Sequence, residues 1–391
     1  MRDVYIVGIG QTKVGEHWDR SLADLAVEAV LAALADADMD GVDLLYVGNM
    51  LGDVLSGQTQ LGALVADQAG LGSIPAMRIE AADASGAAAL HEAYRAVAGG
   101  LVETALVVGV EKMTDRLPEV VEGAMTAGGS ADYETAHGVT YTAQSALIMQ
   151  RYMFENGLHV DDFAPFAVNA HRNAGANPFA MYRSAISEKT YRQAKMVASP
   201  VNLLDGAPLA DGAAAMILTS AEGAARLGRV AVRIAASTMA TDRLLVTDRP
   251  DFLSLDAARR SAADAYQAAG VSPADVDVAE VHDAFGILAA LSLEACGFAE
   301  RGQGVKIAQA GEIGRDGRIP IASLGGFKAR GNPVGASGIY QAAEIVTQLL
   351  GRAGVSQVAG ARVGLAQNLG SNGATAVTHI FTLDQGGGQT S

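Results

Sequence analysis

The sequence predicts a layered α/β fold built from two halves, and three observations support this class. Strand-like and helix-like segments alternate along most of the 391 residues, as expected for helices that pack on sheets. The alternation runs through two series that share an order of elements. Between the two series, residues 115–205 are richer in Tyr, Asn, His and charged side chains. We expect this stretch to be an insertion that packs over a functional site.

The first series begins with a short apolar strand at residues 5–8 and continues with a helix at residues 21–37. Ser21 is suited to be the N-cap of this helix, because a serine hydroxyl can accept a hydrogen bond from a free backbone N–H of the first turn. Apolar residues recur along one face of the same helix, which predicts that this face is buried. The remaining elements expected in this series are a strand at 42–47, a helix at 60–69, a strand at 77–82, a helix at 86–97 and a strand at 104–110.

Strand periodicity returns after the insertion, at residues 213–219, and the second series begins at residue 230. We expect an N-terminal half at residues 1–225, with 115–205 as its loop domain, and a C-terminal half at 226–391. The elements expected in the second series are a strand from 230, a helix at 255–270, a strand at 278–281, helices at 286–296 and 338–351, and strands at 362–366 and 374–381.

Composition and charge exclude several classes of protein. Hydrophobic residues make up 50% of the chain, which is enough for a large core, yet no unbroken apolar run reaches the roughly 18 residues of a membrane span. The first residues read as a strand and not as a signal peptide. A formal net charge of −15 argues against general nucleic-acid binding. Cys296 is the only cysteine, so no intramolecular disulfide can form, and we expect a cytoplasmic protein.

The sequence gives no sign of a metal or of a tightly bound cofactor. The histidines lack the spacing of metal ligands, and Gly8 and Gly10 are not followed by the third glycine of a dinucleotide-binding loop. Basic residues recur at Arg183, Lys189, Arg192 and Lys195, and again at Lys328 and Arg330. These residues predict either a solvated surface or a local site for a phosphorylated ligand.

Two segments carry a family resemblance. Residues 78–88 read RIEAADASGAA, and residues 325–338 read GGFKARGNPVGASG. Both resemble signature segments of the thiolase superfamily, especially the sterol-carrier-protein-x-type and archaeal thiolases. Three further segments are similar to the same family in the same order: HRNAGANP at 171–178, LDGAPLADGAAA at 204–215 and VHDAF at 281–285. The resemblance implies a thiolase-like fold over nearly the whole chain, with two βαβαβαββ-type halves in a layered α-β-α-β-α arrangement.

The first signature segment departs from the family at Asp83, which stands where thiolases carry their nucleophilic cysteine. A residue between a strand end and a helix start meets free N–H groups that favour an anion, so Asp83 should be ionised unless burial outweighs this effect. A carboxylate that attacked a thioester would form a more reactive mixed anhydride, so acyl transfer through Asp83 is disfavoured. The alternatives are a general base, a group that positions the ligand, or a simple helix cap.

The resemblance implies four further site residues. His282 lies in a motif whose histidine helps to form an oxyanion hole, and Asn332 replaces a histidine that would act as a base. An amide can donate a hydrogen bond to an enolate but cannot take its proton. The backbone N–H of Gly370, with that of Asp83, would form a second oxyanion hole. Tyr340 follows the glycine-rich loop and is either an acid near Asn332 or a core residue.

The predicted substrate is an acyl-CoA thioester. The favoured reaction is retro-aldol cleavage of a β-hydroxyacyl-CoA without an acyl-enzyme, as implied by the similarity to steroid side-chain aldolases. The alternatives are an acetyl-CoA acetyltransferase-type acyltransferase with displaced catalytic groups and a non-catalytic acyl-CoA-binding scaffold. The resemblance also implies a homodimer or a dimer of dimers, because the strand before Asp83 would otherwise be an open edge. A small partner protein with an OB-fold and a zinc ribbon is a further expectation.

Overall fold

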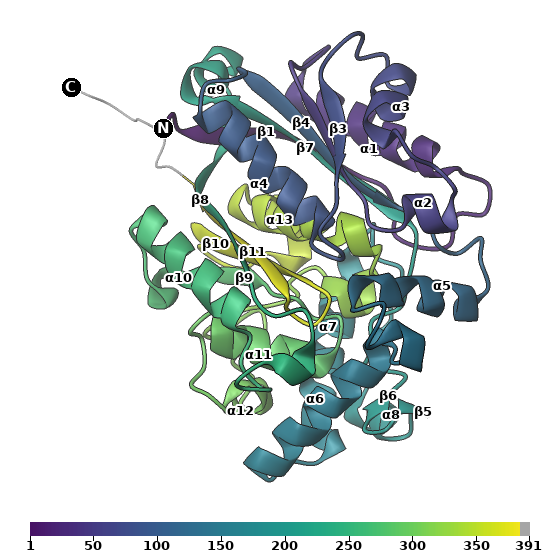
Figure 1. The fold of residues 1–391 in the computed structure, drawn as a ribbon. Coiled ribbons are helices and arrows are strands. Elements are labelled where there is room, and N and C mark those ends of the chain that lie inside the picture. Colours follow the sequence, from purple (N-terminus) through teal and green to yellow (C-terminus); the bar gives the residue numbers. More distant parts are fainter. Residues whose placement is uncertain (384–391) are drawn as a thin grey trace.

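The computed structural model describes residues 1–383 and arranges them in alternating layers of helices and strands (Figure 1). Helix α1 (Leu22–Ala37) covers the outer face of the N-terminal strands. Helices α4 (Ser85–Ala98) and α13 (Ser337–Leu349) contact each other between the strands of the two halves, and α10 (Asp256–Ala269) covers the far side of the C-terminal strands. This order confirms the predicted layered α/β arrangement.

The strands of both halves join in one nine-stranded sheet with the order β3-β2-β4-β7-β1-β8-β11-β10-β9. The two halves meet where β1 pairs with β8, through Tyr5 with Arg233 and Ile6 with Val232. The strands of this sheet are β1 (Val4–Gln11), β2 (Leu45–Gly48), β3 (Ala76–Ile79), β4 (Thr104–Glu111), β7 (Gly212–Ser220), β8 (Val232–Thr241), β9 (Val278–Glu280), β10 (Val363–Gly370) and β11 (Thr375–Leu383). A separate pair consists of β5 (Met196–Ala198) and β6 (Val201–Asn202).

The helices agree closely with the expected segments. Ser21 accepts a hydrogen bond from the N–H of Asp24 at 3.1 Å, and the Asp24 carboxylate accepts one from the N–H of Ser21 at 2.9 Å. This reciprocal capping box fixes the start of α1 at the predicted residue. The remaining α-helices are α2 (Gly52–Leu55), α3 (Leu61–Gln68), α5 (Pro118–Met125), α6 (Tyr141–Asn156), α7 (Ala164–Asn173), α8 (Glu188–Arg192), α9 (Ala221–Leu227), α11 (Gly286–Ala295) and α12 (Gly304–Gln309).

Strand β3 is the terminal strand of the sheet, as the sequence predicted for the strand before Asp83. It ends at Ile79, three residues before the predicted end, because the chain turns before it reaches α4. Ala82 in this turn has a left-handed φ of 53°. The side chain of Met77 on the open edge is 53% exposed, so an apolar group faces solvent there.

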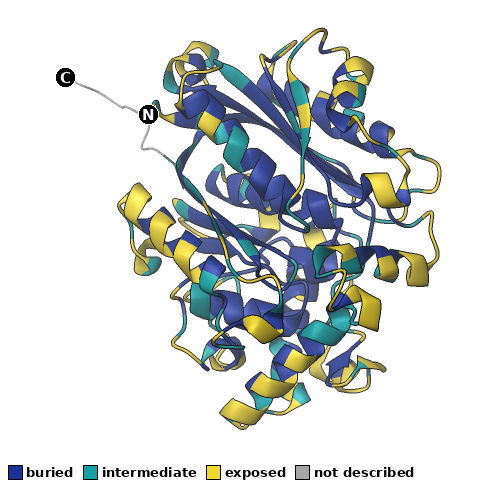
Figure 2. Ribbon diagram, viewed as in Figure 1, coloured by how far each residue is buried: buried dark blue, intermediate teal, exposed yellow. Residues whose placement is uncertain are grey.

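The insertion forms α5 to α8 and packs against the C-terminal half (Figure 1). Helix α7 contacts the π-helical turn Gly326–Arg330, and α6 contacts α11. Figure 2 shows that the helices between the two sets of strands are almost wholly buried, whereas α6 and α10 expose one face. The insertion therefore covers the end of the molecule where the two signature segments meet.

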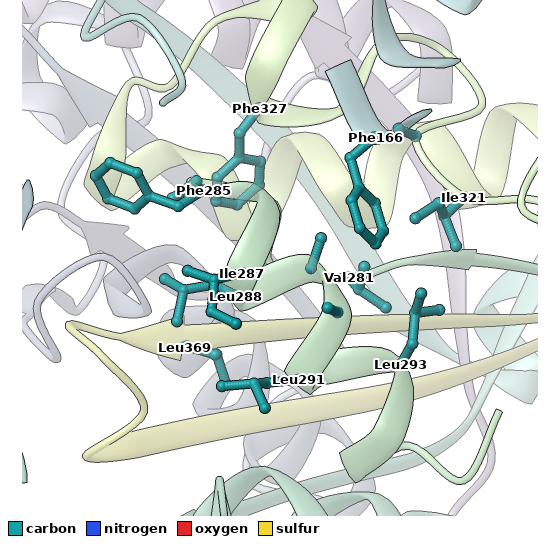
Figure 3. Close-up of a cluster of buried hydrophobic side chains, with 14 of the residues drawn as sticks. Phe166, Val281, Phe285, Ile287, Leu288, Leu291, Leu293, Ile321, Phe327 and Leu369 are labelled. Carbon is teal, nitrogen blue, oxygen red and sulfur yellow. The ribbon is translucent and has the colours of Figure 1, made fainter. Parts of the chain in front are cut away.

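A cluster of buried hydrophobic side chains packs beside this region. Its side chains come from α11, from the strands around it and from the insertion, as Figure 3 shows for Leu291, Leu369 and Phe166. Phe327 is fully buried and Phe285 is 7% exposed. Within residues 1–383, no helix is both long and apolar enough to cross a membrane.

Candidate functional site

The turn before α4 places Asp83 just outside the helix. The Ser85 hydroxyl donates to the carbonyl of Ala82 at 2.6 Å and accepts from the N–H of Ala81 at 2.9 Å, which holds the turn in shape. Ala84 is the N-cap residue, and no side chain caps this helix end. The interpretation of Asp83 as a simple helix cap is therefore wrong.

Burial dominates the electrostatics of Asp83. The side chain is 1% exposed, and its Oδ1 atom has no hydrogen-bond partner among residues 1–383. Burial raises the pKa of Asp83 to about 7, against the opposing effects of its own N–H, the N–H of Ser371 and the side chain of Asn332. Helix-end donors alone would lower this pKa, so desolvation outweighs them. A carboxyl group with this pKa is half ionised near neutral pH and can both take and return a proton.

Asn332 is oriented by its own loop. The Ser337 hydroxyl donates to its Oδ1 at 2.7 Å, and its backbone N–H donates to the carbonyl of Pro208 at 2.9 Å. Because Oδ1 is occupied as an acceptor, the amide N–H₂ is the end that faces Asp83. The preceding Gly331 has a φ of 105°, which a residue with a side chain rarely adopts. The glycine thus allows the sharp turn that presents Asn332.

His282 is a neutral hydrogen-bond donor in this structure. The N–H of Leu369 donates to its Nδ1 at 3.2 Å, so the ring proton is on Nε2. Burial lowers the pKa of His282 to about 3, which excludes the charged form at neutral pH. Nε2 lies 3.1 Å from the Tyr141 hydroxyl, which in turn donates to the carbonyl of Ser371 at 3.2 Å.

Tyr141 is the site residue that the sequence did not reveal. It begins α6 in the insertion, is 8% exposed, and is close enough to Asp83 for that carboxylate to raise its pKa further, beyond the main effect of burial. No motif marks it. The available signal was only an aromatic hydroxyl at a helix start within the predicted insertion, and such residues are common. The tyrosine connects His282 to the Asp83 region across the joint between the insertion and the C-terminal half.

Gly370 lies at the end of β10, close to the Asp83 turn. A side-chain carbon on Gly370 would stand 2.6 Å from the carbonyl oxygen of Ala81, so only glycine permits this approach. The backbone N–H that acts on the Asp83 carboxyl belongs to the next residue, Ser371. The chain turns at Ser371, where φ is 53°, and the role of the Gly370 N–H in an oxyanion hole stays a prediction.

Tyr340 lies apart from these groups. Its side chain is fully buried, and its hydroxyl is 2.9 Å from the carbonyl of Thr12 and 2.8 Å from that of Ala213, both in the N-terminal half. Its ring also lies 4.9 Å from the guanidinium carbon of Arg330. This placement corresponds to the predicted alternative of a core residue and not to an acid beside Asn332.

Lys328 and Arg330 are buried, so the expectation of a solvated surface is wrong for these two residues. Arg330 is 0% exposed and donates to Glu344 at 3.0 Å, while its guanidinium carbon lies 5.3 Å from the Phe327 ring centroid. Asp283, next to His282, accepts the N–H of Phe327 at 2.8 Å. These charged groups stabilise the loop that carries Asn332, since Asp283 satisfies backbone donors that would otherwise be buried without partners and Glu344 pairs with the buried Arg330.

A pocket of about 430 Å³ opens beside the site. Its wall is mostly apolar, with polar groups from Tyr141, Asn332, His171 and Lys328. Other lining residues include Met125, Leu204, Ala207, Pro208, Leu209, Ala284 and Phe285. A concave apolar pocket with a few polar groups is the usual form of a small-molecule site. Within residues 1–383, no cluster of side chains suited to a metal ion is found.

The chain is similar in sequence to known proteins over most of its length. Residues 4–222 match the family described as "Thiolase, N-terminal domain", and residues 238–383 match "Thiolase C-terminal domain-like". An acetyl-CoA acetyltransferase of Methanothermobacter thermautotrophicus is 41% identical over 98% of this chain and 100% of its own length. The benzoylsuccinyl-CoA thiolase subunit BbsB of Thauera aromatica is 34% identical over 89% of each chain.

One solved structure with a similar fold is described as an Ltp2-ChsH2(DUF35) aldolase. It superposes with a TM-score of 0.86 over 98% of both chains, at 24% sequence identity. At this identity the likeness shows the shared fold alone. A human mitochondrial 3-ketoacyl-CoA thiolase has the same fold, with a TM-score of 0.76 and 18% identity over 98% of both chains.

Proposed function

Since the chain belongs to the thiolase superfamily, we propose that it acts on acyl-CoA thioesters and cleaves a carbon–carbon bond without a covalent acyl-enzyme. The specific reaction proposed is the retro-aldol cleavage of a β-hydroxyacyl-CoA. The chain would then be a lyase. Both the base and the enolate-stabilising groups that this reaction needs are available among the buried polar residues around Asp83.

The observation that carries the proposal is the state of Asp83. Its carboxyl group is buried, its Oδ1 has no partner among residues 1–383, and its pKa is about 7. A general base is most effective when its pKa lies near the working pH. In the proposed step the carboxylate takes the proton of the β-hydroxyl, the new carbonyl forms at the β-carbon, and the bond between the α- and β-carbons breaks. The bonding electrons pass to the thioester as an enolate, which is then protonated.

The enolate oxygen needs aimed hydrogen-bond donors. The amide of Asn332, with its orientation fixed by Ser337, and the backbone N–H of Ser371 both act on the region of the Asp83 carboxyl. The neutral His282 carries a further N–H, which the Tyr141 hydroxyl occupies in the present structure. Donors held in a buried site stabilise developing charge far more than donors in water. We propose that Asn332 and His282 supply this stabilisation.

A cysteine acyl-enzyme has little support. The one cysteine of the chain, Cys296, is 1% exposed and follows α11. Burial raises the pKa of its thiol far above the usual value, so the reactive thiolate is disfavoured. Transfer through Asp83 would pass through an anhydride, which lies uphill from a thioester.

One observation favours a second candidate. Two relatives that cover almost all of the chain, at 41% and 39% identity, are named acetyl-CoA acetyltransferase. In an acyltransferase of this kind the groups around Asp83 would activate the nucleophile without a covalent intermediate. A non-catalytic scaffold that only binds acyl-CoA is the remaining alternative.

The test is mass analysis of the products from a panel of β-ketoacyl-CoA and β-hydroxyacyl-CoA substrates. The lyase predicts a shortened acyl-CoA and a free aldehyde or ketone from a β-hydroxyacyl-CoA. Asp83→Asn should abolish this cleavage, because the amide cannot take the proton, while Asp67→Asn on the surface of α3 is the matched control. Transfer of acyl groups between thioesters would favour the acyltransferase, and binding without turnover would favour the scaffold.

We also propose a dimeric assembly through the open edge of β3. This strand is the terminal strand of the sheet, and its Met77, which precedes Asp83 in the sequence, is exposed. Pairing of two β3 edges would cover the edge and brace the site. The name of the Ltp2-ChsH2(DUF35) aldolase couples two components, which supports the expectation of a small partner protein for this chain as well.

A further inference from the structure

The pocket lined by Asn332 and Tyr141 also has two polar residues that the proposed reaction does not use. His171 from α7 and Lys328 from the glycine-rich segment both line it. His171 is 5% exposed and Lys328 is 5% exposed, so both are more than nine-tenths buried. Buried polar groups are normally satisfied, and a group that is not satisfied indicates a missing partner.

His171, one of the residues that line this pocket, has an unused acceptor. Its Nδ1 lies 3.1 Å from the carbonyl oxygen of Ser184, which can only accept, so Nδ1 carries the ring proton. Its Nε2 therefore keeps a free lone pair, and this atom is buried with no partner among residues 1–383. Stacking on Tyr182, with ring centroids 5.9 Å apart, fixes the plane of the ring. Burial and the charge of Lys328 both lower the pKa of His171, which keeps the ring neutral.

Lys328 presents unused donors. Its ammonium group has three N–H bonds. Within the part of the chain that the structure describes, its hydrogen bond goes to the carbonyl of Gly206 at 2.5 Å. Burial lowers the pKa of Lys328 to about 8, while the nearby carboxylates of Asp205 and Asp283 act in the opposite direction and already favour its charged form. A third carboxylate would therefore gain little here, and it would also face the lone pair of His171.

We propose that His171 and Lys328 form a subsite for a neutral ligand group that both donates and accepts a hydrogen bond, a hydroxyl or an amide. This proposal rests on the proposed binding of acyl-CoA thioesters. The hydroxyl or amide proton is donated to Nε2 of His171, and the oxygen accepts from Nζ of Lys328. A free carboxylate lacks the proton and a hydrocarbon lacks both functions. Two parts of a thioester offer this chemistry: a hydroxyl group along the acyl chain, and an amide of the CoA arm.

The test is calorimetric titration with hexanoyl-CoA and with hexanoyl-CoA that carries a hydroxyl on carbon 4, 5 or 6. His171→Phe keeps a flat ring but removes the acceptor, and its dissociation constant should rise about fivefold. Lys328→Met removes the donor and should raise the constant at least about tenfold. His171→Gln restores an acceptor and should recover most of the binding. Lys306→Met on the exposed face of α12 is the matched control.

The outcomes distinguish the two possible ligand groups, a hydroxyl of the acyl chain and an amide of the CoA arm. Equal weakening for all four thioesters identifies an amide of the CoA arm, and weakening for one hydroxylated thioester only identifies an acyl hydroxyl. Unchanged constants for every thioester in His171→Phe overturn the subsite, even if Lys328→Met fails to fold. Because binding is measured without turnover, a wild-type protein that binds but does not cleave contradicts the lyase alone. A wild-type protein that binds none of the thioesters overturns both proposals.

Discussion

The burial of Asp83 has a consequence for stability that does not depend on any substrate. The folded-state pKa of about 7 lies above the reference value of 3.8, by about three units. Each unit corresponds to about 1.4 kcal/mol, so ionising this group in the folded protein costs about 4 kcal/mol. The side chain is 1% exposed, and solvent therefore screens little of this cost.

The direction in which the free energy of unfolding changes with pH follows from which state binds the proton more tightly. Below pH 3.8 the carboxyl is protonated in both states and contributes no penalty. As the pH rises, the unfolded chain loses the proton first, and the folded state becomes progressively less stable until the pH passes about 7. Asp83→Asn removes this titration. The free energy of unfolding of the variant, relative to wild type, should therefore increase by about 2.5 kcal/mol between pH 5 and pH 8.

The assay is urea unfolding of wild type, Asp83→Asn and Asp67→Asn at pH 5 and pH 8. Other buried carboxyl groups, such as Glu111 with a pKa of about 7, titrate equally in all three proteins and cancel in the difference. The free energies of unfolding can be compared when the three proteins have the same slope of free energy against urea concentration. If the Asp83→Asn and wild-type curves keep a constant separation between the two pH values, the reasoning about a raised pKa is refuted.

Further predictions concern the covalent step, the donors, the buried ion pair and assembly. After incubation with acetyl-CoA, intact mass measurement should find no acetyl group at Asp83, and an adduct mapped there would contradict the proposed mechanism. His282→Ala and Asn332→Ala should each raise the barrier to cleavage of the best β-hydroxyacyl-CoA by about 2.7–4 kcal/mol, and unchanged rates in both would remove these residues from the mechanism. Arg330→Met should lower the free energy of unfolding by about 3–5 kcal/mol, because it leaves Glu344 buried without its partner, and a loss below about 1 kcal/mol would count against this view. Light scattering at micromolar concentration should give at least twice the mass of one chain, whereas a monomer would speak against pairing of β3.

Local sequence signals were sufficient for most elements of the fold. The start of α1 follows from Ser21 and its neighbours alone, and the glycine-rich loop at Asn332 needs its glycines for backbone geometry. The pKa of Asp83 depends instead on how completely distant segments exclude water from it. A helix end can be recognised in one segment, but burial cannot.

The predictions about the site that differ from the structure also depend on contacts between distant segments, which one segment cannot reveal. Tyr141 joins the site only because α6 packs beside Ser371, which is far away in the sequence. Tyr340 is two residues from the signature loop, yet its hydroxyl points toward Thr12 in the N-terminal half. Lys328 and Arg330 resemble surface residues by type, and only the three-dimensional arrangement of Asp283 and Glu344 makes their burial tolerable.

The composite origin of the site also constrains when it can exist during synthesis. Asp83 leaves the ribosome long before His282, Asn332 and Ser371, and within the nine-stranded sheet of residues 1–383 the strands of the two halves pair directly at β1 and β8. An N-terminal half can therefore fold early while its carboxyl group still faces water. The enclosed environment forms when β10 and the glycine-rich loop dock onto the turn before α4. A truncated or partly folded chain would thus carry the acidic residue without its reactive surroundings, and competence for chemistry would coincide with completion of the fold.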